Sequence, residues 1–559
     1  MSFLLNIFCN KIFITMLQCI DICKRWVSKM RLQDKRYVYQ KNKQTGVVYV
    51  YENYPYWDKT TKKDRANRVC VGKLDENGNL IPTRGRKANH TLQLQEAQPL
   101  AKRSYYGATY LLDAIGQQLG ITRDLQKCFP HTYKQILSLA YYLILETDSP
   151  LYRFTKWHNT HKHPYDNDIS SQRSSELFAS ITEAAKTRFF MLQGKRREEK
   201  EYWALDSTSI SSFSETLKQV KFGHNKENDS LPQINFALVY GEKSKLPFYY
   251  KKYPGNMPES KTIKNLLAEL MDMGLTKVKL LTDRGCYSEA NINEFYQSHI
   301  KFLVGVRTGL KYVRNILDTV SKDISKLDNY SQEYGVYGCT VKTQWDYKQE
   351  RPYKGDILKG KKKAYLHIYY NIDKAAEDER KLISKLACLR SELLSNNRVE
   401  DHEKSYDKYF IVTQTPKRGI KVITKEDVIQ EEKKYYGYFA LLSNEVKDTW
   451  EALCLYRMKD LVEKAFSNLK DRLNMRRMLV SSEQSLDGKL FVQFVALIFM
   501  SYINKQMCEK KMYKNYTLQE VLDTLDVIDC YEFEGKKLRA GEILEEQRAL
   551  YIKFGVPPL

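Results

Sequence analysis

The sequence lacks the cysteine patterns that build disulfide frameworks or zinc modules. Its 11 cysteines form no CxxC pair and no Cys/His series with zinc-ligand spacing. This absence predicts a reducing, cytoplasmic setting. Most of the cysteines lie within apolar runs, Cys388 and Cys454 among them, and we predict that they pack as small core residues.

A clean membrane span and an internal repeat are also missing. The apolar segment 490–503 is too short to cross a bilayer and is followed by polar residues. Residues 3–23 are apolar but interrupted by polar groups, and they have neither the basic start nor the cleavage site of a signal peptide. We expect residues 1–29 to be a mis-assigned start, with Met30 the true one, or else a disordered or amphipathic arm.

The sequence has fewer acidic than basic residues. It contains 68 Asp and Glu and 91 Lys and Arg, which gives a formal net charge of +23. Such a balance favours a polyanionic partner, because each phosphate contact releases counterions. The 41 tyrosines interleave with lysines, as in residues 249–252, which suits stacking in a nucleic-acid groove. An AT-rich genome would enrich Lys, Tyr, Asn and Ile together, and composition alone does not separate the two explanations.

The 559 residues are too many for one compact core, so three or four domains are expected. Residues 30–90 have the β-branched and aromatic runs of short strands. Residues 107–200 have apolar positions at helical spacing. Within them, the segment 170–181 exposes Gln172 and Arg173 and is either a recognition helix or a packing helix.

From residue 202 to residue 306 the pattern becomes strands and helices in the order β-β-β-α-β-α-β. This order predicts a mixed α/β layer with helices on its faces. Lysine- and tyrosine-rich strands around a charged helix at 374–394 then interrupt the layer. Beyond them we expect a strand at 438–442 and a long helix at 449–473.

Two aspartates occupy positions where such layers place ligands. Asp206 lies in the apolar strand Tyr-Trp-Ala-Leu-Asp, where an unneutralised carboxylate is costly to bury. Asp283 follows the strand Val-Lys-Leu-Leu-Thr, at a carboxyl end. Together they would bind oxygen-seeking cations such as Mg²⁺. Each aspartate taken alone is more often a helix cap or a loop-end residue.

A third carboxylate lies on the helix expected over 449–473. Four polar positions, at offsets 0, 3, 7 and 14, fall on one narrow stripe at about 100° per residue: Tyr456, Lys459, Glu463 and Lys470. Five apolar residues fill the adjoining stripe, which should face the core: Leu455, Val462, Phe466, Leu469 and Leu473. One carboxylate flanked by an aromatic ring and two cations suits chemistry on phosphate. A solvated face with a Lys459–Glu463 ion pair has the same spacing.

The series Tyr456-x2-Lys459-x3-Glu463-x6-Lys470 resembles the Y-x2-(R/K)-x3-E-x6-K signature of DDE transposases of the insertion-sequence-four group. Lys459 stands where that family usually has Arg, so a point-charge contact with phosphate is expected in place of a bidentate one.

Further segments extend the resemblance over nearly all of residues 30–559. Leu205 to Thr208 and Thr282 to Gly285 resemble the surroundings of the family's two aspartates. Val71 to Asp75, together with the C-terminal segment 545–556, resembles the 1634-type branch of the group.

The resemblance implies a ribonuclease H-like, mixed-sheet α/β catalytic domain, interrupted by a β-rich insertion and preceded by a mainly helical DNA-binding region. The implied divisions are 1–29 (start or arm), 30–90 (small β-rich region), 91–200 (helical DNA-binding domain), 201–324 (catalytic, first part), 325–437 (β-rich insertion), 438–510 (catalytic, second part) and 511–559 (helical tail).

The resemblance also implies the chemistry and the partners. Asp206, Asp283 and Glu463 would be catalytic and would bind two Mg²⁺ ions, for which Mn²⁺ can substitute. DNA contacts are implied for the flanking residues of the signature: Tyr456, Lys459 and Lys470. The implied partners are double-stranded DNA, as terminal inverted repeats and as target, and a second copy of the chain in an active homodimer. The protein would be associated with the nucleoid and not with a membrane.

Two other functions fit the same carboxylates. One is a nuclease of this fold that does not join strands, and the other is a catalytically inactive DNA-binding relative. A serine or tyrosine recombinase is disfavoured, because nothing in the sequence resembles the Arg and His clusters around their nucleophiles.

Overall fold

The computed structural model of the chain describes residues 37–58, 63–75, 78–82, 102–196, 201–214, 216–223, 230–275, 278–351, 353–415, 419–473, 475, 480, 482–533 and 536–559. They fall into two compact units, Met1–Leu100 and Ala101–Leu559. The expectations for residues 1–29 lie outside the described residues.

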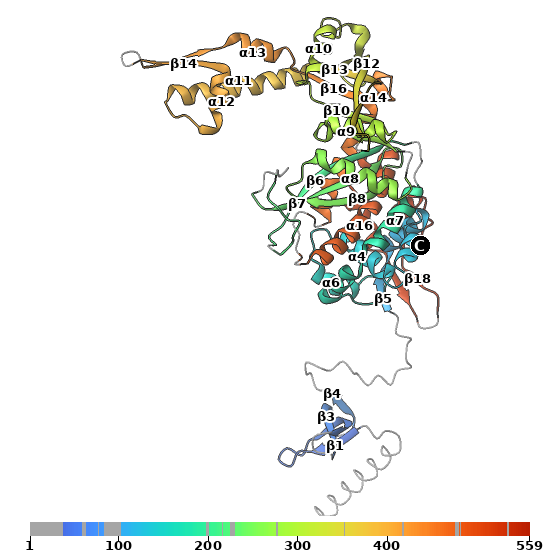
Figure 1. Cartoon of the computed structure of the whole chain (residues 1–559). Helices are drawn as coiled ribbons and strands as arrows, with labels where there is room; N and C mark the ends of the chain where they lie inside the picture. The colour runs from blue at the N-terminus through green and yellow to red at the C-terminus, as the bar shows by residue number, and fades with distance from the viewer. Residues whose placement is uncertain are drawn as a thin grey trace, which may run out of the picture. The chain divides into compact units, whose positions relative to one another are not determined.

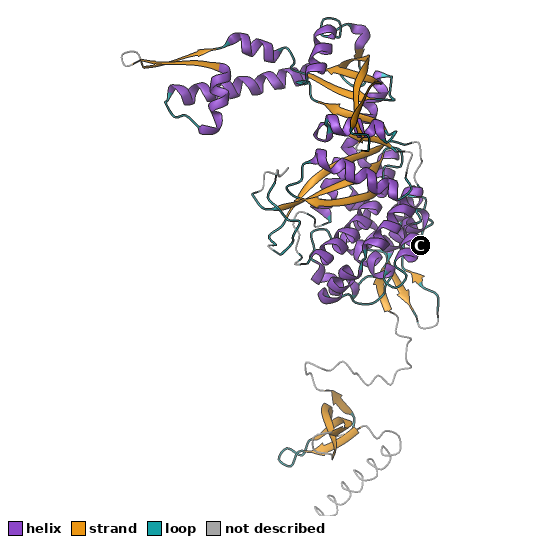
Figure 2. Ribbon diagram, viewed as in Figure 1, coloured by secondary structure: helices purple, strands orange, loops and turns teal. Residues whose placement is uncertain are grey.

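The first unit is a small antiparallel sheet in the order β1-β2-β3-β4 (Figure 2). Its strands are β1 (Tyr37–Lys41), β2 (Val48–Asp58), β3 (Lys63–Leu74) and β4 (Leu80–Pro82). Runs of β-branched and aromatic residues favour these strands, as the sequence predicted.

The second unit is built on one nine-stranded mixed sheet in the order β11-β12-β13-β16-β10-β9-β6-β7-β8 (Figure 1). The strands are β6 (Trp203–Ser211), β7 (Gln233–Gly241), β8 (Pro247–Pro254), β9 (Lys279–Thr282), β10 (Lys301–Val306), β11 (Tyr330–Ser331), β12 (Val336–Arg351), β13 (Asp356–Tyr370) and β16 (Tyr438–Ser443). β6, β7 and β8 are antiparallel neighbours, whereas β9 and β10 run parallel to β6.

Helices and turns follow these strands, and the alternation of patterns predicted the two helices that precede β9 and β10. They are α8 (Glu259–Asp272), α9 (Glu289–Gln297), α10 (Lys311–Val320), α14 (Thr449–Arg457), α15 (Lys459–Ser467), a π-helical turn (Asn468–Arg472), and short 3-10 turns at Arg284–Cys286 and Leu327–Asn329. The mixed α/β class expected from the sequence is therefore confirmed.

The segment expected as a β-rich insertion divides into two parts. Its strands β12 and β13 join the central sheet through the pairing of β13 with β16. The remainder forms a lobe with its own apolar cluster, in which Leu389 and Leu393 pack with Phe410. The lobe contains α11 (Ile372–Leu394), a 3-10 turn (Glu400–His402), α12 (Glu403–Tyr409), β14 (Phe410–Thr415), β15 (Gly419–Thr424) and α13 (Glu426–Lys433). It projects away from the sheet in Figure 1.

The helices that precede the sheet pack around α16 (Glu483–Glu509), which contacts α4 and α6. They are α2 (Gly107–Gln118), α3 (Ile121–Cys128), α4 (Tyr133–Leu145), η1 (Leu151–Arg153), α5 (Phe154–His158), α6 (Ser171–Ser180) and α7 (Glu183–Lys195). Among the described residues, α16 alone is long and apolar enough to cross a membrane, and 89% of its most apolar window is buried inside the protein. The prediction that the apolar segment 490–503 is too short for a span is wrong about the helix's length, because the helix extends from Glu483 to Glu509; its burial makes it the central core helix of this unit.

The C-terminal segment packs back onto the helices near the start of the unit. It consists of a 3-10 turn (Met512–Lys514), α17 (Leu518–Asp526), β17 (Asp529–Glu532), β18 (Arg539–Ala540) and α18 (Glu545–Lys553). β17 pairs with β5 (Lys102–Tyr105), and Tyr551 on α18 donates a hydrogen bond to the Gly107 carbonyl at 2.9 Å. The two ends of this unit are therefore held together.

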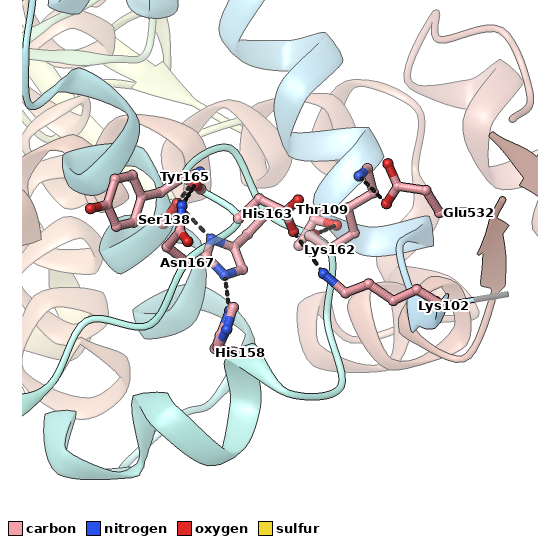
Figure 3. A network of polar contacts seen from close by, with 10 residues as sticks. Lys102, Thr109, Ser138, His158, Lys162, His163, Tyr165, Asn167 and Glu532 are labelled. Carbon is pink, nitrogen blue, oxygen red and sulfur yellow. Dashed lines mark hydrogen bonds and ion pairs between the residues drawn. The ribbon is translucent and has the colours of Figure 1, made fainter. Parts of the chain in front are cut away.

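A polar network strengthens that closure (Figure 3). His163 Nδ1 lies 2.9 Å from Ser138 Oγ on α4, and its Nε2 lies 2.9 Å from His158 Nδ1. Lys162 donates to Glu532 on β17 at 3.1 Å. Burial lowers the pKa of His163 to about 4, so its ring stays neutral at physiological pH and links α4 to the loop after α5.

The prediction that Cys388 and Cys454 are core residues is wrong, because both are exposed. Each lies in an apolar run on an amphipathic helix, but its position turns it to solvent while its neighbours Leu389 and Leu453 are buried. Local hydrophobicity predicted each helix correctly but did not predict which of its residues face the solvent.

Candidate active site

Asp206 and Asp283 lie side by side on neighbouring parallel strands. Leu205 on β6 is in register with Thr282 on β9, so the residues that follow them are level with each other. Adjacent strands lie about 4.8 Å apart. Apolar residues bury β9, and the 3-10 turn at Arg284–Cys286 begins directly after Asp283, which leaves this carboxylate at the carboxyl end of the strand.

Tyr456 on α14 fixes the orientation of Asp283. Its hydroxyl donates a hydrogen bond to Asp283 Oδ1 at 2.6 Å. Burial favours the protonated form of Asp283, but this hydrogen bond and the charge of Lys459 outweigh burial and hold its pKa below the usual value. Burial and the nearby Asp283 and Asp206 raise the pKa of Tyr456, so the hydroxyl keeps its proton and remains a donor.

Lys459 connects the aspartates to Glu463. Its Nζ lies 3.5 Å from Asp283 Oδ2 and 3.3 Å from Glu463 Oε1. Burial alone would lower the pKa of Lys459, but Asp283, Glu463 and Asp206 together raise it. The ammonium group therefore interacts electrostatically with all three predicted carboxylates. The helix that carries Lys459, α15, packs against β6.

The site formed by Asp206, Asp283 and Glu463, which we name the carboxylate corner, has ligand groups that suit a hard divalent cation. Asp206, Asp283 and Glu463 offer carboxylate oxygens alone, which Mg²⁺ prefers. In the described parts of the chain, no three His, Cys, Asp or Glu side chains stand close enough together to hold a metal ion. The ammonium group of Lys459 supplies the positive charge between Asp283 and Glu463. Binding of a metal ion there would require the Lys459 side chain to move away.

The helix expected over 449–473 is broken. α14 ends at Arg457, α15 begins at Lys459, and a π-helical turn over Asn468–Arg472 contains Lys470. The five apolar residues predicted to face the core are all buried. The Tyr456 hydroxyl and the Lys459 ammonium both reach Asp283, as their i,i+3 spacing favours, whereas the polar stripe as a whole does not continue to Lys470 at a constant 100° per residue.

Sequence reasoning missed Gly305 on β10. A Cβ at this position would stand 2.9 Å from the Tyr456 hydroxyl oxygen and 3.0 Å from the Arg284 backbone nitrogen. Only a glycine leaves room for the Tyr456–Asp283 hydrogen bond. The sequence offers a weak signal for it, a lone glycine inside an apolar strand, which often marks a close approach of other groups.

A cleft of about 810 Å³ opens from the carboxylate corner toward the lobe. Its lining is rich in cations and tyrosines: Arg284, Arg307, Arg314, Lys374, Lys381, Lys385, Lys459, Tyr409, Tyr435, Tyr436, Tyr438 and Tyr456. The Arg314 guanidinium lies 4.9 Å from the ring centre of Tyr435, so some of these cations already stack on aromatic faces. Such a lining suits phosphates and unstacked bases.

The candidate recognition helix is α6. Ser170 caps it by accepting a hydrogen bond from the Arg173 backbone, and Gln172 and Arg173 are exposed. Its opposite side packs on α16, where Gly488 allows close approach to Phe178. The helix thus has a packing role, and its exposed start is open to a partner.

Comparison with known proteins identifies a family and similar solved structures. Residues 198–499 match the family described as "Transposase DDE domain", which spans β6 to β16, α14, α15 and most of α16. No curated protein matches the chain. A cryo-EM structure of a piggyBac transposase synaptic complex with hairpin DNA is similar at 11% identity and a TM-score of 0.32, covering 74% of this chain and 70% of that one.

Proposed function

The chain belongs to the transposase DDE domain family, and on that premise we propose that it is a transposase of the insertion-sequence-four group, 1634-type branch. It binds the inverted-repeat ends of its element, cuts them and joins them to target DNA. One observation carries the proposal beyond the family: Asp206 and Asp283 are level on adjacent parallel strands, where Lys459 bridges Asp283 to Glu463.

Asp206, Asp283 and Glu463 are the proposed catalytic and metal-binding residues. Two Mg²⁺ ions, or Mn²⁺ in their place, would supply activation of the attacking oxygen and charge stabilisation at the leaving oxygen. Tyr456 keeps Asp283 ionised and oriented before any ligand binds. The same donor set would not favour softer metals, because it contains no thiolate or imidazole.

Lys459 and Lys470 are the proposed phosphate contacts near the cut. The ammonium group of Lys459 forms ion pairs with the carboxylates of Asp283 and Glu463 in this structure. If a bound cation compensated these carboxylates, the flexible Lys459 side chain would be free to contact the phosphate of a bound strand. A point charge on a long stem suits this movement better than a planar guanidinium would.

The cleft between the sheet and the lobe is the proposed place for the terminal nucleotide. Its tyrosines offer stacking faces for a base that leaves the duplex, and its cations offer contacts for the phosphates on either side. The helical region with α6 is the proposed reader of the inverted repeat, and the active complex is proposed to be a homodimer acting on double-stranded DNA in the cytoplasm, at the nucleoid.

The proposal is tested with a duplex that contains the element's terminal repeat. Wild-type protein should cut it at the end of the repeat in Mg²⁺ or Mn²⁺, and should join a pre-cut end to a second duplex. Cutting without joining would identify a nuclease of this fold. Binding without either reaction, in both metals, would identify an inactive DNA-binding relative and overturn the proposal.

A further inference from the structure

β12 and β13 extend beyond the sheet as a two-stranded ribbon. β13 pairs with β16 only over Tyr365–Tyr370, whereas it pairs with β12 along its whole length. Among the described residues, 343–351 and 356–364 therefore pair as strands only with each other. In Figure 1 these strands lie above α9 at the end of the sheet that is distant from α6.

The two sides of this ribbon differ. One side packs against α9, where the Trp345 indole donates to Asn293 at 2.9 Å and Tyr347 is 5% exposed. Residues that pair directly across an antiparallel ribbon share a side. The opposite side, which we name the basic face, is open and consists of Lys342, Gln344, Asp346, Lys348, Glu350, Ile357, Lys359, Lys361 and Lys363.

The charges of the basic face are not compensated. It has five lysines against two carboxylates, and none of these lysines forms an ion pair with any residue that the structure describes. The neighbouring Arg351, on the packed side, pairs with Asp356 at 2.8 Å. Like charges gathered without partners repel each other, so a face of this kind is stabilised when a polyanion binds it.

The spacing of the lysines matches a nucleic-acid backbone. Lys359, Lys361 and Lys363 are two residues apart on one strand, which separates them by about 7 Å. Successive phosphates along a DNA strand have a similar separation. At the tip of the ribbon, Tyr353 is fully exposed and Ile357 is 53% exposed, so the end offers apolar groups beside cations, as in proteins that enter a DNA groove.

The basic face is distant from the carboxylate corner. β13 and β10 are both antiparallel to β16 and so run parallel to each other. Leu366 and Val304 pair with the same residue of β16, and Val304 pairs with Thr282, so Leu366 is level with the end of β9. The lysines precede Leu366 by three to seven residues, which places them roughly 20 Å or more from Asp283 across and along the sheet.

We propose that the basic face is a second DNA-binding surface, which holds the backbone of duplex DNA without reading its sequence, away from the bond that is cut. The inference rests on the proposed function, because it takes DNA as the polyanion. Its ligand chemistry is the phosphodiester backbone of a duplex, whether the DNA is the element's own or the target.

The test compares two triple variants in the full-length protein. Lys359→Gln/Lys361→Gln/Lys363→Gln removes three cations of the basic face that have no ion-pair partner among the described residues, although Lys363 lies over the Tyr365 ring. Lys245→Gln/Lys264→Gln/Lys326→Gln removes three cations, two exposed and one half-buried, that are already paired with Glu509, Glu294 and Asp323. Binding to a duplex of unrelated sequence and to a terminal-repeat duplex is measured at several salt concentrations, with melting curves to check folding.

The basic-face variant should lower the slope of log K against log salt by about 2–3 and weaken binding roughly tenfold to a hundredfold near 0.15 M salt. The loss should be the same for both duplexes, and the paired-lysine variant should bind like wild type. An unchanged slope, an equal loss in the paired-lysine variant, or a loss confined to the terminal-repeat duplex would overturn the proposal.

Cleavage of a terminal-repeat duplex that is too short to reach the ribbon distinguishes a failure of the proposed function from a failure of the second DNA-binding surface. It should proceed at the wild-type rate in the basic-face variant. If wild-type protein never cuts but the basic-face variant still loses duplex binding, the proposed function fails and the second surface stands.

Discussion

The carboxylate corner and the basic face differ in whether their charged side chains have ionic partners. At the corner, Asp283 and Glu463 share the ammonium group of Lys459, and Tyr456 donates to Asp283 as well. On the basic face, five lysines have no ionic partner among the described residues. The corner is an interdependent network, in which each group sets the state of the next, whereas the face is a set of independent charges.

The difference predicts how substitutions combine. Removing one member of a coupled network changes the charge compensation of the others, so effects are non-additive. Removing one of several independent phosphate contacts costs a fixed share of the affinity, so effects are small and additive. The following changes test that contrast, from the largest expected effect to the smallest.

Asp283→Asn should abolish cleavage while leaving binding to terminal-repeat DNA nearly intact. The change removes a proposed metal ligand, and charge stabilisation at such a site contributes several kcal/mol, so the rate should fall by at least about 10²-fold. Asp206→Asn and Glu463→Gln should behave alike. Single-turnover cleavage and filter binding measure the two properties, and a cutting rate near wild type in Glu463→Gln would place the third carboxylate elsewhere.

Gly305→Ala should slow cleavage about 10- to 100-fold, because the added methyl group would displace the Tyr456 hydroxyl from Asp283. Gly309→Ala is the matched control, since a Cβ there meets nothing within 4 Å although Gly309 lines the same cleft. Both proteins are compared in cleavage and in binding. Equal rates in the two variants would show that the close approach at Gly305 has no role.

Tyr456→Phe should make the protein more sensitive to acid. The pKa of Asp283 is lowered in the folded state, so its ionised form contributes stability above its ordinary pKa of about 4 and loses it as pH falls through the lowered value. Without the Tyr456 hydrogen bond that pKa rises, and the acid limbs of melting temperature and cleavage should both move to higher pH. The loss at neutral pH should be about 1–2 kcal/mol.

A double-mutant cycle of Tyr456→Phe with Lys459→Gln extends this measurement. Both groups act on Asp283, so the two losses should not add. Purely additive losses of stability and cleavage would contradict a coupled corner.

Lys361→Gln should have the smallest effect. It should lower the salt slope for duplex binding by about one and leave cleavage of a short end unchanged. Lys359→Gln and Lys363→Gln should each do the same, and the three losses should sum to that of the triple variant. A single lysine that accounts for the whole loss would mean that the face is one specific contact.

Local patterns in the sequence predicted the core of the fold well. The strands β6 to β10 and the helices between them lie within a few residues of their expected positions, because alternation and helical spacing are local signals. The position of Asp283 at the carboxyl end of β9 could also be predicted, because α/β layers place ligands there, whereas Asp206 lies inside β6, which continues to Ser211.

What the sequence could not show depends on long-range pairing or on small breaks. The lengths of β12 and β13 and their union with the central sheet rest on pairing with β16, which lies 68 residues after β13 in the chain (438 − 370). The junction at Met458 between α14 and α15 and the π-helical turn at Asn468–Arg472 leave no mark in the pattern. The exposed faces of Cys388 and Cys454 depended on packing partners that no local window contains.

The order of the chain has a consequence during synthesis. Glu463 emerges from the ribosome 180 residues after Asp283 (463 − 283), a delay of roughly 10–40 s at ordinary translation rates. For most of that interval, from the synthesis of β10 until that of β16 at Tyr438–Ser443, β10 has no β16 beside it, so the sheet ends in an open apolar edge that is prone to mispairing. A nascent or truncated chain thus already contains two of the proposed catalytic carboxylates but lacks the third, and protein released early would be unable to cut DNA.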